Sequence, residues 1–136
     1  FVSLKEIVSI IAGDTQNATH QIYLNSAKLD HVIFKQDGYK SVILNQMDNH
    51  LSDHTTCKFG KWYASDGKDY FGSQSNYSIL DKPHAQVHNS IKHVINIAKS
   101  NSLMSKNDEV LSSFEQAEKA SVELFSMMDR LTESNR

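Results

Sequence analysis

Helix-breaking residues are scarce in this chain of 136 residues, which contains one proline, Pro83, and five glycines. Stretches without either residue favour helices, because proline removes a backbone donor and glycine loses the most conformational freedom on ordering. Apolar residues recur at three- and four-residue steps, and no alternating strand pattern competes with that period. The sequence therefore predicts an all-α fold, and its length suits a single domain with a real core.

The periodic segments predict four main helices, packed as an antiparallel four-helix bundle with a short helical insert that carries Cys57. They fall at about residues 15–33, 39–50, 81–100 and 106–133. Asp81 is placed to cap the third helix, and Pro83 fits its first turn. A separate apolar helix precedes the bundle and is expected to end near Gly13, and Gly67 is expected to end the insert. The predicted boundaries are therefore an upstream helix or linker at 1–13 and the bundle domain at 14–133.

Charge and apolar content exclude several classes of partner. The formal net charge is -2, and the 14 basic residues are scattered, so no electrostatic footprint for nucleic acid or an anionic membrane is present. No stretch approaches the roughly 18 apolar residues of a membrane span. A single cysteine forms no internal disulfide, which favours a reducing compartment. Because the chain begins with Phe1 rather than Met, we expect it to be a piece of a longer protein.

Two histidines, His84 and His88, stand four residues apart on the best-defined predicted helix. This spacing puts both imidazoles on one face, about one turn apart, where they can hold one tetrahedral metal ion. The same pattern also occurs on ordinary polar helix faces, so the pair alone leaves both interpretations open.

Cys57 lies in the segment "CKFGKW" and admits three interpretations: a small buried hydrophobe, a nucleophile or a metal ligand. Phe59 and Trp62 are suited to anchor the turn in the core, and Gly60 allows close backbone approach. No oxyanion hole or orienting acid accompanies a Cys/His pair, so catalysis is not supported and we expect no enzyme activity. A metal site explains why a cysteine and an HxxxH pair share one small helical chain, and a thiolate with imidazoles suits zinc.

A closed zinc site needs a fourth ligand, and the residues alone leave its identity open. His31 lies on the apolar pattern of its helix, and His20 is not excluded by periodicity. A local rival set consists of His50, His54 and Cys57, but its surroundings are polar and we expect both histidines to be solvated. His93 lies about half a turn off the face of His88 and is expected on the surface.

Taken together, these elements resemble the chemoreceptor zinc-binding domain family. Its pattern is a histidine with an aromatic residue or leucine three positions later, then a Cys-x-apolar-Gly-x-apolar/aromatic segment, then HxxxH. Here His31 is followed by Phe34, then by "CKFGKW", and then by "HAQVH" at His84 to His88. All elements are present in order, and His50 and His54 match none of them.

The resemblance implies a zinc ion held by four residues, which are His31, Cys57, His84 and His88. It also implies a cytoplasmic, usually homodimeric regulatory domain without membrane contact, attached to a bacterial chemotaxis receptor or a diguanylate cyclase. Through the receptor its partners would be the chemotaxis histidine kinase and the coupling protein. The expected signals are zinc availability and oxidants such as hypochlorous acid acting on the cysteine. A purely structural zinc module used for dimerisation is the main alternative.

Overall fold

The computed structural model describes residues 3–45 and 51–133. Every regular element in this part of the chain is helical, which confirms the all-α prediction. The elements are α1 (Leu4–Ile43), α2 (Lys58–Ala64), α3 (Asp66–Phe71), α4 (Ser75–Ser78), α5 (Asp81–Lys99) and α6 (Asn107–Glu133). Three of these helices are long, so the expected arrangement of four long antiparallel helices is not confirmed for the described residues.

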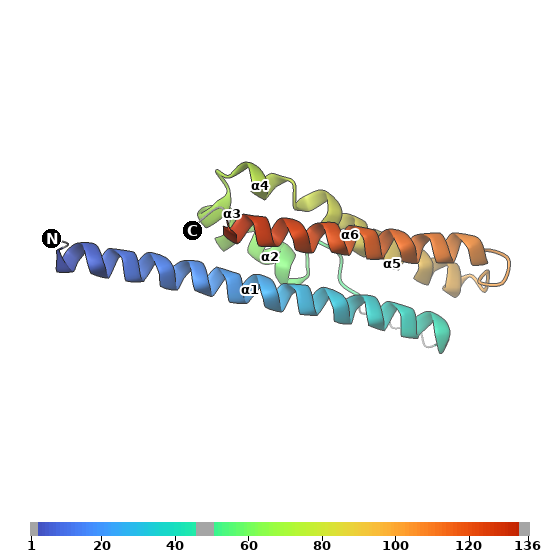
Figure 1. The fold of residues 1–136 in the computed structure, drawn as a ribbon. Helices are drawn as coiled ribbons and strands as arrows, with labels where there is room; N and C mark the ends of the chain where they lie inside the picture. Colours follow the sequence, from blue (N-terminus) through green and yellow to red (C-terminus); the bar gives the residue numbers. More distant parts are fainter. Residues whose placement is uncertain (1–2, 46–50, 134–136) are drawn as a thin grey trace.

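The long helices lie side by side (Figure 1). α5 and α6 form an antiparallel pair joined by a short connection, and α1 packs on both, running in the same direction as α5. The short helices α2, α3 and α4 lie near the C-terminal end of α6, and α2 contacts the middle of α1. The N-terminal part of α1 extends beyond the other elements.

Helix α1 is longer than the sequence pattern suggested. It starts with a capping box, in which the Ser3 hydroxyl accepts from the Glu6 backbone and the Glu6 carboxylate accepts from the Ser3 backbone. It then continues through Gly13 and Gly38 to Ile43. The predicted helix end near Gly13 is therefore wrong, because one helical glycine costs only about 1 kcal/mol. The predicted domain boundary at 13/14 stays a prediction.

Gly38 explains why no separate helix starts at 39. A Cβ at this position would lie 2.5 Å from the Cγ2 atom of Ile91, so the glycine permits close approach of α1 to α5. It is a packing residue within one continuous helix. Of the predicted helix at 39–50, residues 39–43 belong to α1, and residues 46–50, including His50, lie outside the described residues.

Two further expectations about helix ends need correction. Gly67 lies inside α3, where an added Cβ would meet the Trp62 ring at 2.7 Å, and the break between α2 and α3 falls at Ser65. The N-cap of α5 is Leu80 rather than Asp81, which occupies the first turn without a capping side-chain bond. Pro83 lies in that first turn as predicted.

The largest buried cluster surrounds the insert. Phe59 and Trp62 of α2 pack with Leu24 of α1 and with Leu124 and Met128 of α6. The two predicted anchors are 1% and 6% exposed, respectively. This packing fixes α2 between α1 and α6 and so positions the turn that begins with Cys57. No helix among the described residues is both long enough and apolar enough to cross a membrane.

Candidate metal centre

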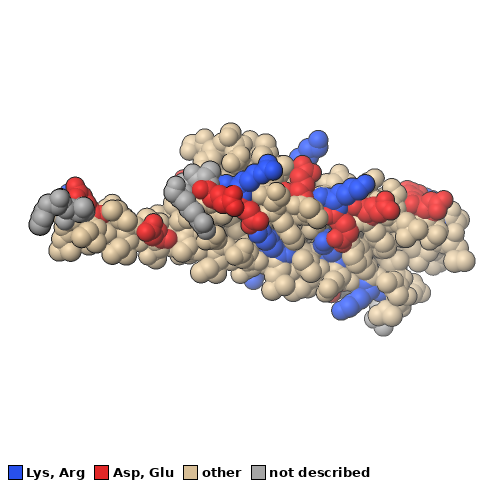
Figure 2. Space-filling model, viewed as in Figure 1, with Lys and Arg blue, Asp and Glu red and all other residues tan. Residues whose placement is uncertain are grey.

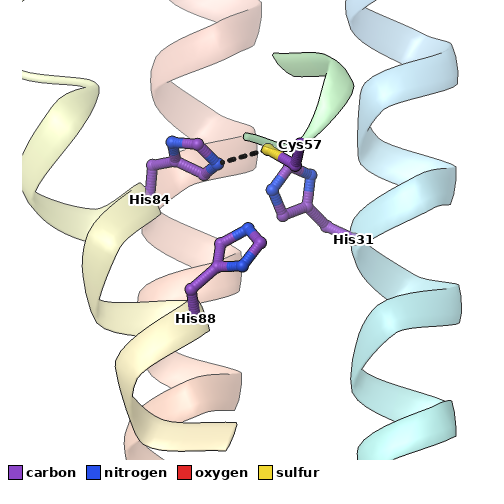
Figure 3. Close-up of side chains that lie close together, drawn as sticks. All are labelled: His31, Cys57, His84 and His88. Atoms are coloured by element: carbon purple, nitrogen blue, oxygen red, sulfur yellow. Dashed lines mark hydrogen bonds between the residues drawn. The ribbon is translucent and has the colours of Figure 1, made fainter. Parts of the chain in front are cut away.

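Four side chains from three elements converge in the interior (Figure 3). His31 comes from α1, Cys57 from the start of α2, and His84 and His88 from α5. One ligand atom from each residue lies within 4.8 Å of the others, and these four form a possible metal site. The structure thus brings together the four residues that the resemblance implied as zinc ligands, which we call the ligand cluster.

The two α5 histidines hold their positions because the helix is deeply buried. His84 and His88 are each 1% exposed, and both share a face with Val87 and Ile91, which are fully buried. Their ring centroids lie 5.0 Å apart at an interplanar angle of 88°. The i, i+4 spacing therefore has the predicted effect, since it places both imidazoles on one face of a buried helix and directs them toward the same point.

The tautomers of two histidines follow from their backbone partners. His31 Nδ1 lies 2.7 Å from the Ala27 carbonyl oxygen, and His88 Nδ1 lies 2.9 Å from the Ser52 carbonyl oxygen. Because a carbonyl only accepts, each Nδ1 carries the proton and each Nε2 presents a lone pair. Outer hydrogen bonds of this kind orient metal-binding histidines.

Both of these Nε2 atoms are buried and have no hydrogen-bond partner among the described residues. An unpartnered buried acceptor is costly, so its presence needs an explanation. Two of them facing a cysteine sulfur and a third imidazole match the donor set and closed arrangement of a zinc site. The residues present therefore fit the ion that the motif implies.

Cys57 is the N-cap residue of α2, and its sulfur accepts from the Gly60 backbone amide at 3.3 Å. The same sulfur lies 3.3 Å from His84 Nε2. Gly60 permits the tight turn, because a Cβ there would stand 1.9 Å from the His54 carbonyl oxygen. The close backbone approach predicted for this glycine is confirmed.

Burial sets the protonation of the cluster. It lowers the pKa of His84 to about 2 and that of His88 to about 4, and it also lowers the pKa of His31. Burial raises the pKa of the Cys57 thiol, against the opposing effect of the backbone amides around it. At neutral pH the histidines are therefore neutral and ready to bind a cation, whereas the thiol must first lose a proton.

Of the remaining histidines, His20 and His93 both lie outside the ligand cluster. His20 stacks on Tyr70 at 4.2 Å and lies outside the ligand cluster, so the open choice for the fourth ligand falls on His31. His93 is exposed and pairs with Glu109 at 2.6 Å, as expected for a surface histidine.

His54 is the exception, because it is partly buried rather than solvated. Its ring lies 5.7 Å from that of His84, although it is not part of the ligand cluster. The polar loop sequence predicted a solvated side chain, because it does not show that the loop backbone lies against Gly60 of α2.

A cavity of about 340 Å³ adjoins the ligand cluster. It is lined by Cys57, His31 and His88 on the inside, and by polar residues that include Asp30, Thr56 and Lys58. Three of the four residues of the ligand cluster, Cys57 among them, therefore border this open space.

Comparison with known proteins agrees with the motif. Residues 31–95 match the model of the family described as the chemoreceptor zinc-binding domain. No curated protein and no solved structure matches the chain. The matched segment begins at the first residue of the ligand cluster and contains the other three. The family whose model matches residues 31–95 is thus the one that the sequence motifs indicated.

Proposed function

We propose that this domain binds one zinc ion through His31, Cys57, His84 and His88, and that it serves as a non-catalytic regulatory module of a bacterial signalling protein. The observation that carries the zinc proposal is the pair of buried, unpartnered Nε2 atoms facing the Cys57 sulfur. Their Nδ1 protons are already committed to backbone carbonyls, so these imidazoles need no reorganisation to act as ligands.

The ligand residues would join segments that are far apart in the sequence. Cys57 is 26 residues after His31 and 27 and 31 residues before the two α5 histidines. When bound, zinc supplies a positive charge that holds the sulfur as thiolate and ties the three segments together. Ion binding thereby contributes to the stability of this arrangement of α1, α2 and α5.

The cysteine is the residue through which an oxidant would act, as the family resemblance implies. The thiolate sulfur takes the chlorine of hypochlorous acid and releases hydroxide. Water then displaces chloride, which leaves a sulfenic acid on the oxidised sulfur. A sulfenic sulfur is a poorer donor, so the link between α2 and the histidines weakens. The cavity beside Cys57 supports this proposal, since a small oxidant reaches the sulfur from that side.

The proposed output follows from the same resemblance. The domain would be cytoplasmic and would act on a chemotaxis receptor, and through it on the histidine kinase and coupling protein. Regulation of a diguanylate cyclase is the alternative context. Because α1 bears His31 and packs on α5 and α6, loss of the Cys57 link would change the packing of the helix that leads out of the domain.

A structural zinc module remains the second candidate, favoured by the deep burial of the three histidines. Two measurements separate the candidates. Elemental analysis of protein expressed with ample zinc should find about one zinc per chain, and protein without zinc would contradict both candidates. Mass spectrometry should find that hypochlorous acid oxidises Cys57 faster than hydrogen peroxide does. An unreactive Cys57 in a protein that still binds zinc would exclude the oxidant-sensing role and favour the structural role.

A further inference from the structure

His54 lies beside the ligand cluster without belonging to it. The three histidines of the cluster have ring centroids between 4.9 and 5.4 Å apart. The ring of His54 lies 5.7 Å from that of His84, at an interplanar angle of 82°. Its distance from His84 is therefore only slightly longer than the longest spacing within the cluster.

His54 and the sulfur of Cys57 approach the cluster on the same side. The sulfur lies 3.3 Å from His84 Nε2, and it lies 3.7 Å from the backbone oxygen of His54. His31 comes from α1, and His88 comes from the next turn of α5 (Figure 3). Among the four residues of the cluster, Cys57 is therefore the one that His54 is placed to replace.

The backbone of His54 is held in place, whereas its side chain is not. The Asp53 carboxylate accepts from the backbone amides of Thr55 and Thr56, and the His54 carbonyl oxygen lies against Gly60. The imidazole is partly buried, and it makes no hydrogen bond to another described residue. Rotation about the side-chain bonds therefore carries the ring toward the cluster and breaks no hydrogen bond within the described part of the chain.

Carboxylates are the other protein donors that zinc accepts. On the face shown in Figure 2, acidic side chains lie at the surface over α6 and at the projecting end of α1, and no described carboxylate belongs to the ligand cluster. The Asp53 carboxylate already accepts three hydrogen bonds from Thr55 and Thr56. Asp30 lines the adjoining cavity but is exposed. Asp30 is therefore the rival that a test of His54 must include.

We propose that His54 is a reserve ligand, which completes the zinc site when the sulfur of Cys57 is not available as a donor. This inference rests on the proposed zinc site and deepens it. A neutral imidazole attracts the cation less than a thiolate does, so His54 stays outside the site while the sulfur is bound. Replacement would move the link from the N-cap of α2 to the loop before it. The zinc ion would then stay bound while the start of α2 is released.

The test is a double-mutant cycle on zinc affinity, measured by competition with a chelator. His54→Phe keeps an aromatic ring beside His84 but has no donor nitrogen. In the wild-type background it should change the affinity by less than about twofold. In the Cys57→Ala background it should lower the affinity by at least about tenfold, because the fourth ligand is lost. The absence of this additional loss, or a Cys57→Ala protein that binds no zinc, would overturn the inference.

Asp30→Asn in the Cys57→Ala background is the matched control. It should change zinc affinity by less than about twofold, because the exposed carboxylate is not the replacement. A loss of about tenfold here, with none from His54→Phe, would assign the replacement to Asp30 and would also overturn the inference.

Azide gives a readout that a packing role of His54 would not change. When Cys57→Ala and His54→Phe are combined, the fourth position is open, and azide should alter the absorption spectrum of the cobalt-substituted protein. With Cys57→Ala alone, His54 fills that position and the spectrum should not respond. Equal responses would contradict the reserve role. Wild-type protein that binds no zinc would instead contradict the proposed site itself, so the two failures are distinguishable.

Discussion

The two sides of the ligand cluster are built very differently. His84 and His88 belong to a helix of 19 residues, ten of which are buried. Cys57 is the N-cap of a helix of seven residues and is only partly buried. A site built this way has one side fixed by packing and another held by a turn and a few hydrogen bonds, and a local change acts first on the second side.

Of the substitutions considered, removal of a ligand on α5 should have the largest effect on zinc affinity. We expect His84→Ala to lower zinc affinity by at least about 100-fold, because loss of a ligand should exceed the 10- to 100-fold cost of losing an outer hydrogen bond. Competition with a chromophoric chelator measures the affinity. His93→Ala is the control and should stay within about twofold.

The variant His54→Ala tests the local rival set directly. We expect it to retain zinc, since His54 lies outside the ligand cluster. A loss as large as that of His84→Ala would show that the partly buried His54 takes a ligand's place.

The pH dependence of zinc binding should come from the cysteine side alone. Burial already keeps the pKa of His84 at about 2 and that of His88 at about 4, and it raises the pKa of Cys57. Burial also lowers the pKa of His31 from its usual range, so at pH 7 and above the folded chain has one proton to lose on binding. Zinc affinity should fall about tenfold when the pH is lowered from 8 to 7.

Calorimetry in buffers of different ionisation enthalpy counts the released protons and checks this slope. We expect about one proton per zinc at pH 7. A count of two or more would mean that the histidines are charged in the metal-free protein. The Cys57→Ser variant should remove the slope.

A change to the turn that holds Cys57 should have a smaller effect. Gly60→Ala places a Cβ 1.9 Å from the His54 carbonyl oxygen, so the turn must shift. We expect a loss of about 1–3 kcal/mol in the free energy of unfolding, as for other overpacked sites, and a zinc affinity about tenfold lower. Thermal and denaturant unfolding and chelator competition measure both.

The matched control is Gly13→Ala, where nothing lies within 4 Å of the added Cβ. It should stabilise the chain by about 0.5–1 kcal/mol through helix propensity. Zinc affinity should not change. Equal destabilisation by both substitutions would show that Gly60 has no special role in the turn.

The smallest expected effect concerns the loop before the cysteine. The Asp53 carboxylate accepts from the Thr55 hydroxyl and from the Thr55 and Thr56 backbone amides, the two amides at 2.8 and 3.0 Å, and these bonds lower the pKa of Asp53. Asp53→Ala should loosen this turn and speed alkylation of Cys57 in the metal-free protein about two- to threefold. Asp53→Asn keeps an acceptor and should react at nearly the wild-type rate. A slower reaction in Asp53→Ala would contradict the role of this loop.

Sequence periodicity alone determined that the chain is helical and that His84 and His88 share one face, because helical spacing depends only on local geometry. The family resemblance, carried by His31, the segment around Cys57 and the HxxxH pair, named the members of the ligand cluster without contact information. Phe59, Trp62 and Gly60 were assigned as the frame of the cysteine turn for reasons of size and backbone freedom, and their burial and close approach agree.

Only the tertiary structure decided how these parts meet. Gly13 and Gly38 both lie inside α1, and the sequence does not distinguish their roles. A Cβ added at Gly13 would meet open space, whereas a Cβ added at Gly38 would contact Ile91. A glycine ends a helix or permits a close contact depending on its neighbours in space, which local patterns do not contain. The same reason explains His54, whose polar setting indicated solvent, but whose place near His84 depends on how the loop folds over α2.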